Sequence, residues 1–273
     1  MYNNFPGEGM RCILKLVEEF QIREGIQSIE VNIFNVRTKG EIPDLSHDIY
    51  LSTGGPGSPL ALGENWEKPY FHFIDSLLDY NKLDEVQAGE KSKKFMFLIC
   101  HSFQLVARHL GIGHVTKRKS TSFGVFPVNQ LDKSIKEELF EGLPEPFFVV
   151  DSRDYQLVSP NKKKVKELGV TILRMEKERP HVNLERAIMA IRFSEEVFGT
   201  QFHPEADGIG MLKYLSSDDK KKAVIKTHGL AKYNDMVDKL DDPDKILLTE
   251  SIIIPRFLKI ATESIFKTNL VFH

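Results

Sequence analysis

The sequence predicts an α/β protein with a doubly wound, mostly parallel sheet, helices on both faces, and a C-terminal helical appendage. Residues 95–100 form a continuous apolar run, which is typical of a strand buried on both faces of a parallel sheet. Residues 104–110 follow with helical spacing, and a strand that leads into a helix is the repeating unit of α/β folds. Beyond residue 207 the apolar spacing is helical only, so we expect the sheet to end before that point.

Helix and strand patterns alternate ahead of the apolar run. Apolar residues recur at helical spacing within 10–20, whereas apolar and polar residues alternate over 29–34 as they do in a strand. Residues 48–52 predict a second strand, which leads into a loop at 53–59 that is too rich in Gly and Pro for either element. Residues 66–78 again have the spacing of a helix.

Short strands and then helices are expected downstream. The β-rich runs predict strands with hairpin-like links, at 124–128, 147–150, 170–174, 187–192 and 197–202. The helical stretches that follow are interrupted at 216–219, at Gly229 and at 241–243, where an N-cap precedes a first-turn proline. We therefore divide the chain into an α/β domain at 1–215 and a helical extension at 216–273.

Composition argues against several classes of function. The 37 Lys and Arg residues are matched by 39 Asp and Glu residues, so no broad basic field is expected to hold nucleic acid. No apolar run approaches the length that spans a bilayer, and the amino end does not resemble an export signal, so no membrane partner is expected. The two cysteines, Cys12 and Cys100, are too few for a disulfide framework, and we expect a cytoplasmic protein.

Three separated segments carry the residue types of one cysteine-based active site. Residues 53–59 read TGGPGSP, residues 100–104 read CHSFQ, and residues 201–205 read QFHPE. In this order they resemble the class I glutamine amidotransferases, whose glutaminase domains carry a GGPGSP-like loop, a G-x-C-x-G-x-Q turn and a QFHPE-like segment. The resemblance covers residues 1–215, points most to the glutaminase domain of GMP synthase, and implies a flavodoxin-like sheet.

Cys100 is the expected nucleophile, because it lies where a strand turns sharply into a helix. A thiol at its ordinary pKa is mostly protonated near neutrality, so it needs an adjacent base, and the base needs a group that orients its ring. His203 and Glu205 supply that pair, because residues two apart in an extended segment point the same way. We expect Cys100, His203 and Glu205 to form a catalytic triad.

Backbone amides are expected to stabilise the tetrahedral intermediate, which carries negative charge on oxygen. Gly55 lies in a loop whose missing side chains let the backbone approach a substrate, and His101 begins the helix after the nucleophile. The resemblance gives these two positions the same role, and it places Gln104 and Gly54 against the substrate. The spacing of the remaining histidines is not that of metal ligands, so neither a metal nor a cofactor is expected.

Two residues beside the nucleophile depart from the family pattern. Leu98 and Ser102 stand where the family usually has glycine, because the turn is tight. The side chain of Leu98 must find space beside this turn, and we expect it to tune access to Cys100 rather than abolish the chemistry. Arg153 stands where the family often has histidine, and we assign the segment 151–158 no catalytic role.

The resemblance implies a glutaminase that hydrolyses the glutamine side-chain amide through a cysteine thioester and supplies ammonia. The sequence contains no recognisable synthase domain, so the ammonia acceptor is expected to be a separate synthase partner. Two alternatives remain open. One is a stand-alone γ-glutamyl hydrolase of amines or peptides, which would use the same triad, and the other is a non-catalytic regulatory homologue in which Leu98 and Ser102 compromise the turn.

The amino end carries one further expectation. The family's sheet normally begins with a strand immediately before the first helix, whereas residues 3–7 are polar and turn-prone. We therefore expect the natural reading frame to start upstream of Met1, with roughly five to ten residues of apolar strand ahead of Tyr2.

Overall fold

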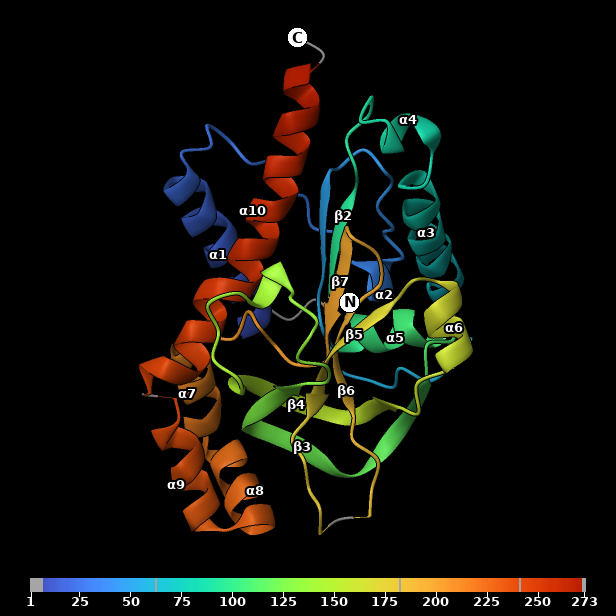
Figure 1. The fold of residues 1–273 in the computed structure, drawn as a ribbon. Coiled ribbons are helices and arrows are strands. Elements are labelled where there is room, and N and C mark those ends of the chain that lie inside the picture. Colours follow the sequence, from blue (N-terminus) through green and yellow to red (C-terminus); the bar gives the residue numbers. More distant parts are fainter. Residues whose placement is uncertain (1–6, 62, 182, 241, 272–273) are drawn as a thin grey trace.

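The computed structural model describes residues 7–271 except Leu62, Val182 and Asp241, and it confirms the predicted α/β class. One seven-stranded sheet has the order β1-β2-β7-β6-β5-β3-β4 (Figure 1). Its strands are β1 (Ile49–Ser52), β2 (Phe95–Ile99), β3 (His114–Gln130), β4 (Phe147–Val158), β5 (Thr171–Glu176), β6 (Ile188–Arg192) and β7 (Val197–Thr200).

The parallel part of the sheet consists of β1, β2 and β7. Every residue of β2 and β7 is buried, as the continuous apolar run at 95–100 predicts. β6, β5, β3 and β4 extend this part with antiparallel pairings, in agreement with the predicted hairpin-like links. The nucleophile candidate therefore follows the central strand of three parallel ones, at their carboxyl ends, where α/β sheets commonly bind ligands.

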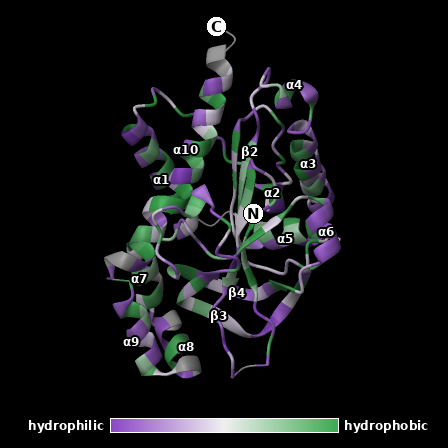
Figure 2. Ribbon diagram, in the orientation of Figure 1, coloured by the Kyte–Doolittle hydropathy of each residue, from purple (hydrophilic) through white to green (hydrophobic). Residues whose placement is uncertain are grey.

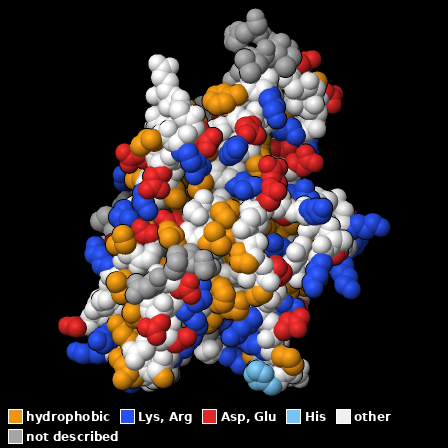
Figure 3. Space-filling model, turned by 60° about the vertical axis from the view of Figure 1, so that its left-hand side comes forward, with side chains coloured by type: hydrophobic (Ala, Val, Ile, Leu, Met, Phe, Trp, Pro, Cys, Tyr) orange, Lys and Arg blue, Asp and Glu red, His pale blue; other side chains and the backbone are white. Residues whose placement is uncertain are grey.

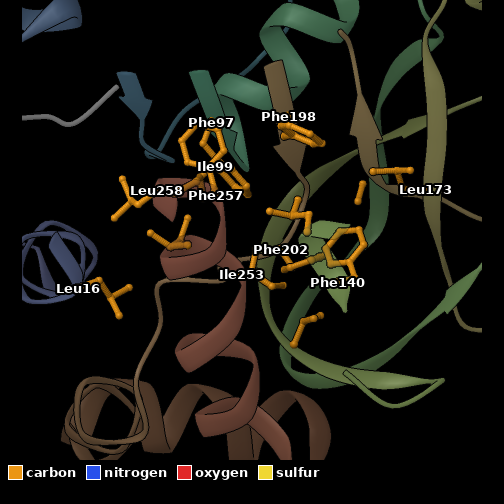
Figure 4. Packing of buried hydrophobic residues seen from close by; sticks show 14 of the residues in the cluster. Leu16, Phe97, Ile99, Phe140, Leu173, Phe198, Phe202, Ile253, Phe257 and Leu258 are labelled. Carbon is orange, nitrogen blue, oxygen red and sulfur yellow. The ribbon is translucent and has the colours of Figure 1, made fainter. Parts of the chain in front are cut away.

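Helices cover both faces of the parallel strands (Figure 1). α3 (Glu67–Tyr80) and α5 (His101–His109) pack on one face, and α1 (Glu8–Glu24) and α10 (Leu248–Val271) pack on the other. Alternate residues of β2 enter two separate hydrophobic clusters, and Figure 4 shows Phe97 and Ile99 of β2 against Phe257 and Leu258 of α10. The shorter helical elements are α2 (Val36–Lys39), α4 (Asp84–Gln87), η1 (Glu138–Phe140) and α6 (Lys162–Glu167).

The C-terminal region is helical, as the sequence predicts. α7 (Gly208–Ser216), α8 (Asp218–His228) and α9 (Leu230–Asp238) are separated near the predicted interruptions, and a π-helical turn, η2 (Pro243–Leu247), precedes α10. Side chains of α7, α8 and α9 pack against Val125 of β3 and Val150 of β4. α10 instead shares a hydrophobic cluster with α1 and β2, so the last helix stabilises the sheet that carries Cys100.

The strand expected at 29–34 is wrong. These residues lie between α1 and α2 in an irregular conformation, and the side chains of Val31 and Ile33 are 47% and 59% exposed. In the described part of the chain, β1 pairs only with β2, and a groove of about 770 Å³ lies between the outer edge of β1 and residues 29–34, so this segment does not reach β1 to pair with it. Alternation predicts a strand only where a partner is present.

The distribution of polar and charged residues agrees with the balanced composition. Apolar residues concentrate in β2 and along α10, whereas outward-facing helices such as α6 are polar (Figure 2). On the face shown in Figure 3, acidic and basic side chains are intermixed. Within the described residues, no helix combines the length and apolarity needed to cross a bilayer.

Candidate active site

Cys100 occupies a strained turn between β2 and α5. Its φ is 50°, a left-handed conformation that among the described non-glycine residues only Ser159 shares. The amide of Cys100 donates to the carbonyl of Thr200 at 2.7 Å, and the residue is 6% exposed. Strain of this kind persists only where the surroundings enforce it, so the sheet and α5 together hold the thiol in place.

Ser102 locks this turn to the neighbouring strands. Its hydroxyl accepts a hydrogen bond from the amide of Ile99 at 2.9 Å and donates to the carbonyl of Ser52 at 2.6 Å. The side chain is completely buried. The replacement of the usual glycine by serine thus adds a tie between the end of β1 and the nucleophile turn, a role that the sequence pattern alone does not reveal.

Leu98 finds its space on the side of the sheet that faces away from the cluster containing Cys100. Leu98 packs beneath α5 in the same hydrophobic cluster as Phe103, and the residue paired with it on β7 is Gly199. A Cβ at Gly199 would lie 3.2 Å from the Cβ of Leu98 and 2.8 Å from a ring carbon of Phe103. This chain has Leu98 where the family usually has glycine, and the glycine on the adjacent strand, Gly199, leaves the space that the larger side chain needs.

We predict that Leu98→Gly destabilises the fold rather than altering the site. Removing a fully buried side chain leaves a cavity, which is expected to lower the free energy of unfolding by about 3 to 5 kcal/mol. Urea denaturation measures this loss, and the labelling rate of Cys100 by a small electrophile should stay close to that of the unaltered chain. A changed labelling rate at unchanged stability would show instead that Leu98 tunes access to the thiol, as the sequence led us to expect.

His203 and Glu205 lie side by side at the same edge of the sheet. Nδ1 of His203 is 2.8 Å from Oε1 of Glu205, and the amide of His203 donates to the carbonyl of Val150 at 2.9 Å. Burial opposes protonation of the imidazole, but the charges of Glu205 and Cys100, with hydrogen bonds to both, raise the pKa of His203 well above its ordinary value of 6.5. The structure therefore brings the three predicted triad residues together.

The first turn of α1 backs Glu205. Glu205 is 3% exposed, and Gly9 lies so close that an added Cβ would be 3.4 Å from Oε1. Oε2 has no hydrogen-bond partner in the described residues. Arg11 fixes α1 here through hydrogen bonds to both oxygens of Asp207, at 2.7 and 2.9 Å.

The glycine-rich loop closes over the nucleophile. A Cβ at Gly54 would lie 2.9 Å from Cε1 of His203 and 3.3 Å from the Cβ of Cys100. Arg37 holds the outer part of the loop by donating to the carbonyl of Pro56. Gly55 follows Gly54 in the same loop and is partly buried.

We predict that Gly54→Ala impairs the site through this contact. Its methyl group must displace the imidazole of His203 by several tenths of an ångström, and misplacement of a catalytic group is expected to lower turnover by about 10². Gly63→Ala is a control for steric contact only: an added Cβ there meets no neighbour within 4 Å, although the φ of 69° strains any side chain, so its stability is measured beside its activity. Steady-state rates of the two variants with glutamine decide the matter, and equal rates would contradict the prediction.

His101 and Gln104 both lie on α5 but differ in their surroundings. The imidazole of His101 is 2% exposed, and burial together with the nearby charge of Arg37 lowers its pKa to about 3, so the ring stays neutral. Gln104 donates to Oε1 of Gln201 at 2.8 Å, and Nε2 of Gln201 in turn lies 3.7 Å from Sγ of Cys100. The side chain of Gln104, which is predicted to contact a substrate, thus binds Gln201, and Gln201 in turn contacts the thiol. Gln201 belongs to the QFHPE segment but is not among the site residues predicted from the sequence.

Arg153 lies in a buried ion-pair network. Its Nε is 2.9 Å from both oxygens of Asp151, and Nη2 is 3.3 Å from Glu176. The carbonyl of the intervening Ser152 is 3.8 Å from Sγ of Cys100. Among the residues that the structure describes, no group of His, Cys, Asp and Glu is arranged to hold a metal ion.

Comparisons with known proteins identify the family of this chain and structures with a similar fold. The model of the glutamine amidotransferase class-I family matches residues 19–209. A protein named SMU.1228c has a similar structure, with a TM-score of 0.60 and 14% identity over 96% of this chain and 97% of that one. A glutamine amidotransferase from Thermotoga maritima gives 0.58 and 14% over 91% and 92%, and one from Methylobacillus flagellatus gives 0.55 and 14% over 89% and 88%. A search of curated proteins gave no significant match.

Proposed function

Because the chain belongs to the class-I glutamine amidotransferase family, we propose that it hydrolyses the side-chain amide of glutamine with Cys100 as nucleophile and so supplies ammonia. The arrangement of Cys100, His203 and Glu205 carries this proposal. The thiol lies on a strained turn, the imidazole lies beside it next to Gly54, and the buried carboxylate binds Nδ1 of the ring.

The chemistry proceeds in two halves. The Cys100 thiolate attacks the amide carbon of glutamine while His203, protonated, holds the proton that the thiol lost. The tetrahedral intermediate collapses when His203 protonates the nitrogen, the C–N bond breaks, and ammonia leaves a γ-glutamyl thioester. Water then attacks the thioester with His203 as base, which releases glutamate and restores the thiolate. The amides of Gly55 and His101 are proposed to stabilise the oxyanion in both halves.

The fate of the ammonia is part of the proposal. Residues 7–271, apart from three single positions, form one sheet with its helices. We propose that a separate synthase accepts the ammonia.

A second candidate, a γ-glutamyl hydrolase, is favoured by a basic pocket. The pocket has a volume of about 270 Å³, and its lining includes Arg118, Lys177 and Arg179. Arg118 and Arg179 both form ion pairs with Glu176, at 3.3 and 2.7 Å, and burial of Arg118 lowers the pKa of its guanidinium. The cations outnumber the carboxylates there, so the pocket suits a γ-glutamyl compound whose leaving group carries an acid.

The pocket also lies close to the nucleophile. Asp151 contributes to its wall, and the next residue, Ser152, has its carbonyl 3.8 Å from Sγ of Cys100. Met189 lines the pocket as well, and its carbonyl accepts from the amide of Gln201, whose side chain contacts the thiol. Cys100 does not itself line the pocket, so the second candidate requires that a substrate attached to Cys100 extend past Ser152 to reach the basic side chains.

Three substrates distinguish the two functions. The purified protein is incubated with glutamine, with a γ-glutamyl amide of a neutral amine, and with a γ-glutamyl dipeptide, and glutamate and ammonia are measured. Turnover of glutamine above that of the other two supports the glutaminase. Preference for the dipeptide, with KM raised for the dipeptide alone in Arg179→Gln, supports the hydrolase. Failure of all three substrates, with and without a cell extract that could supply a partner, would contradict both and favour a regulatory homologue.

A further inference from the structure

The basic pocket is built by strands of the antiparallel part of the sheet together with one helix of the C-terminal region. Its lining residues come from β3, β4, β5 and the loop after it, β6 and α9. The volume of about 270 Å³ is just below the range of about 300 to 1,000 Å³ that is typical of pockets for drug-sized ligands. The pocket therefore suits a small molecule rather than a peptide or a nucleic acid.

An irregularity in β3 brings polar side chains to this pocket. β3 pairs with β4 on both sides of the irregularity, but the register shifts between Lys117 and Ser122. Such a shift bends the strand and redirects its side chains. Arg118, Thr121 and Ser122 belong to this stretch, and all three line the pocket.

Three arginines share one carboxylate in the wall of the pocket. Nη2 of Arg118 and Nη2 of Arg153 each lie 3.3 Å from Glu176, and Nη2 of Arg179 lies 2.7 Å from it. Nε of Arg153 also binds both oxygens of Asp151 at 2.9 Å. Burial, together with the positive charge of Arg153, lowers the pKa of Arg118, as expected of a cation whose charge is incompletely compensated.

Two of these guanidinium groups keep buried donors that are not used. Within the described residues, neither Nε of Arg179 nor Nη1 of Arg153 has a hydrogen-bond partner. The side chain of Arg153 is 1% exposed, so solvent does not satisfy it. A buried donor without an acceptor costs free energy, and the arginines around Glu176 can therefore still gain from a further anionic acceptor.

Two lysines from distant parts of the chain meet at Phe126. Nζ of Lys177, which follows β5, lies 5.8 Å from the centroid of the ring, and Nζ of Lys232 on α9 lies 5.4 Å from it. All three residues line the pocket. Lys232 pairs with Asp235 at 2.9 Å, but Lys239 shares that carboxylate at 2.8 Å. The ring thus holds two ammonium groups at the pocket.

α9 is a fixed wall of the pocket rather than a loose appendage. Tyr233 and Met236 of α9 belong to the hydrophobic cluster that contains Val125 of β3. A Cβ added at Gly124 of β3 would lie 3.4 Å from Cε of Met236, so the helix contacts the strand closely. Lys232 immediately precedes Tyr233, and a side chain on a packed helix is placed more precisely than one on a loop.

The balance of charge favours a phosphate group over a carboxylate as the ligand. With Arg153 included, five cationic side chains accompany two carboxylates, those of Asp151 and Glu176. A ligand carboxylate carries one negative charge, whereas a phosphate monoester carries about −1.5 to −2 at pH 7 on one compact group. Guanidinium groups also bind phosphate oxygens in pairs. Phe123 and Met189 supply apolar lining for the remainder of the ligand.

We propose that this pocket binds a small phosphorylated molecule, with the phosphate held by the arginines and lysines and the organic part against the apolar lining. The C-terminal helical region completes the site, because α9 supplies Lys232. The proposal concerns what the pocket holds, and it does not depend on either reaction proposed for Cys100.

Binding of three small anions tests the proposal. Phenyl phosphate, benzoate and glutarate are titrated into the protein at constant ionic strength, and Kd is measured by calorimetry at about pH 7.5, where the phosphate is mostly a dianion. Benzoate has the same ring with one charge, and glutarate has two charges on separate groups. Phenyl phosphate is expected to bind at least about tenfold more tightly than either.

Substitutions locate the site. Lys232→Gln and Arg179→Gln are each expected to weaken binding of phenyl phosphate about tenfold. Lys162→Gln is the matched control, because it removes an exposed cation of α6 that does not line the pocket. Tm of every variant is measured so that a loss of folding is recognised. Cys100→Ala should bind phenyl phosphate as the unaltered chain does, which separates this test from that of the proposed function.

The opposite results are equally clear. Equal Kd values for the three anions, or an effect of Lys162→Gln as large as that of Lys232→Gln, would overturn the proposal. Tighter binding of glutarate than of phenyl phosphate would overturn it as well, and would instead favour a substrate whose leaving group carries carboxylic acids.

Discussion

Replacing Cys100 with alanine is expected to abolish turnover of any substrate that the protein hydrolyses. Members of a catalytic triad act as a unit, so loss of the nucleophile should lower the rate by about 10³ or more. The same change should eliminate labelling by a glutamine-analogue electrophile such as a diazo-ketone. Turnover and the mass of the labelled protein are the two measurements.

Cys12 provides the matched control. It is 2% exposed, and burial raises the pKa of its thiol to about 11, so it is mostly protonated and shielded at neutral pH. Cys12→Ala is therefore expected to retain both labelling and turnover. Equal labelling of the Cys100→Ala variant would show that the electrophile does not report on Cys100 and would remove the main support for its role as nucleophile.

Local patterns were sufficient for the elements that place Cys100. The continuous run of β2 and the helical spacing after it depend only on neighbouring residues, and the structure has a strand, a sharp turn and a helix there. The segments that carry Cys100, His203 and Glu205 could likewise be recognised from short motifs. What the motifs do not contain is the contact between segments, such as the hydrogen bond from Gln104 to Gln201.

The expectations that depend on distant neighbours were harder to make. The strand at 29–34 has the correct alternation but lacks a partner, which only the order of the whole sheet reveals. Leu98 looked like an obstacle beside the nucleophile, yet its register opposite Gly199 gives it room. The pairing of two strands far apart in the sequence, rather than the residue itself, decides whether a large side chain fits.

Glu205→Gln is expected to lower turnover by about 10² to 10⁴ while leaving the shape of the site intact. Glu205 is the nearest carboxylate to the His203 ring, at 2.8 Å, and its charge is a principal cause of the raised pKa of His203. Glutamine can bind Nδ1 but does not stabilise the imidazolium that protonates the leaving group. Cys100 and the glycine-rich loop remain, so substrate binding should change less than kcat.

The same variant should change how stability depends on pH. The pKa of His203 is higher in the folded protein than its ordinary value of 6.5, so the folded state binds the proton more tightly. That stabilisation is fully present below pH 6.5 and is lost as the pH rises through the folded-state pKa of His203. Tm measured upward from about pH 6 should therefore include a decline that is smaller in Glu205→Gln. An unchanged decline of Tm with pH, together with an unchanged kcat, would show that Glu205 neither raises the pKa of His203 nor orients its ring. The hydrogen bond between the two residues would then be structural only.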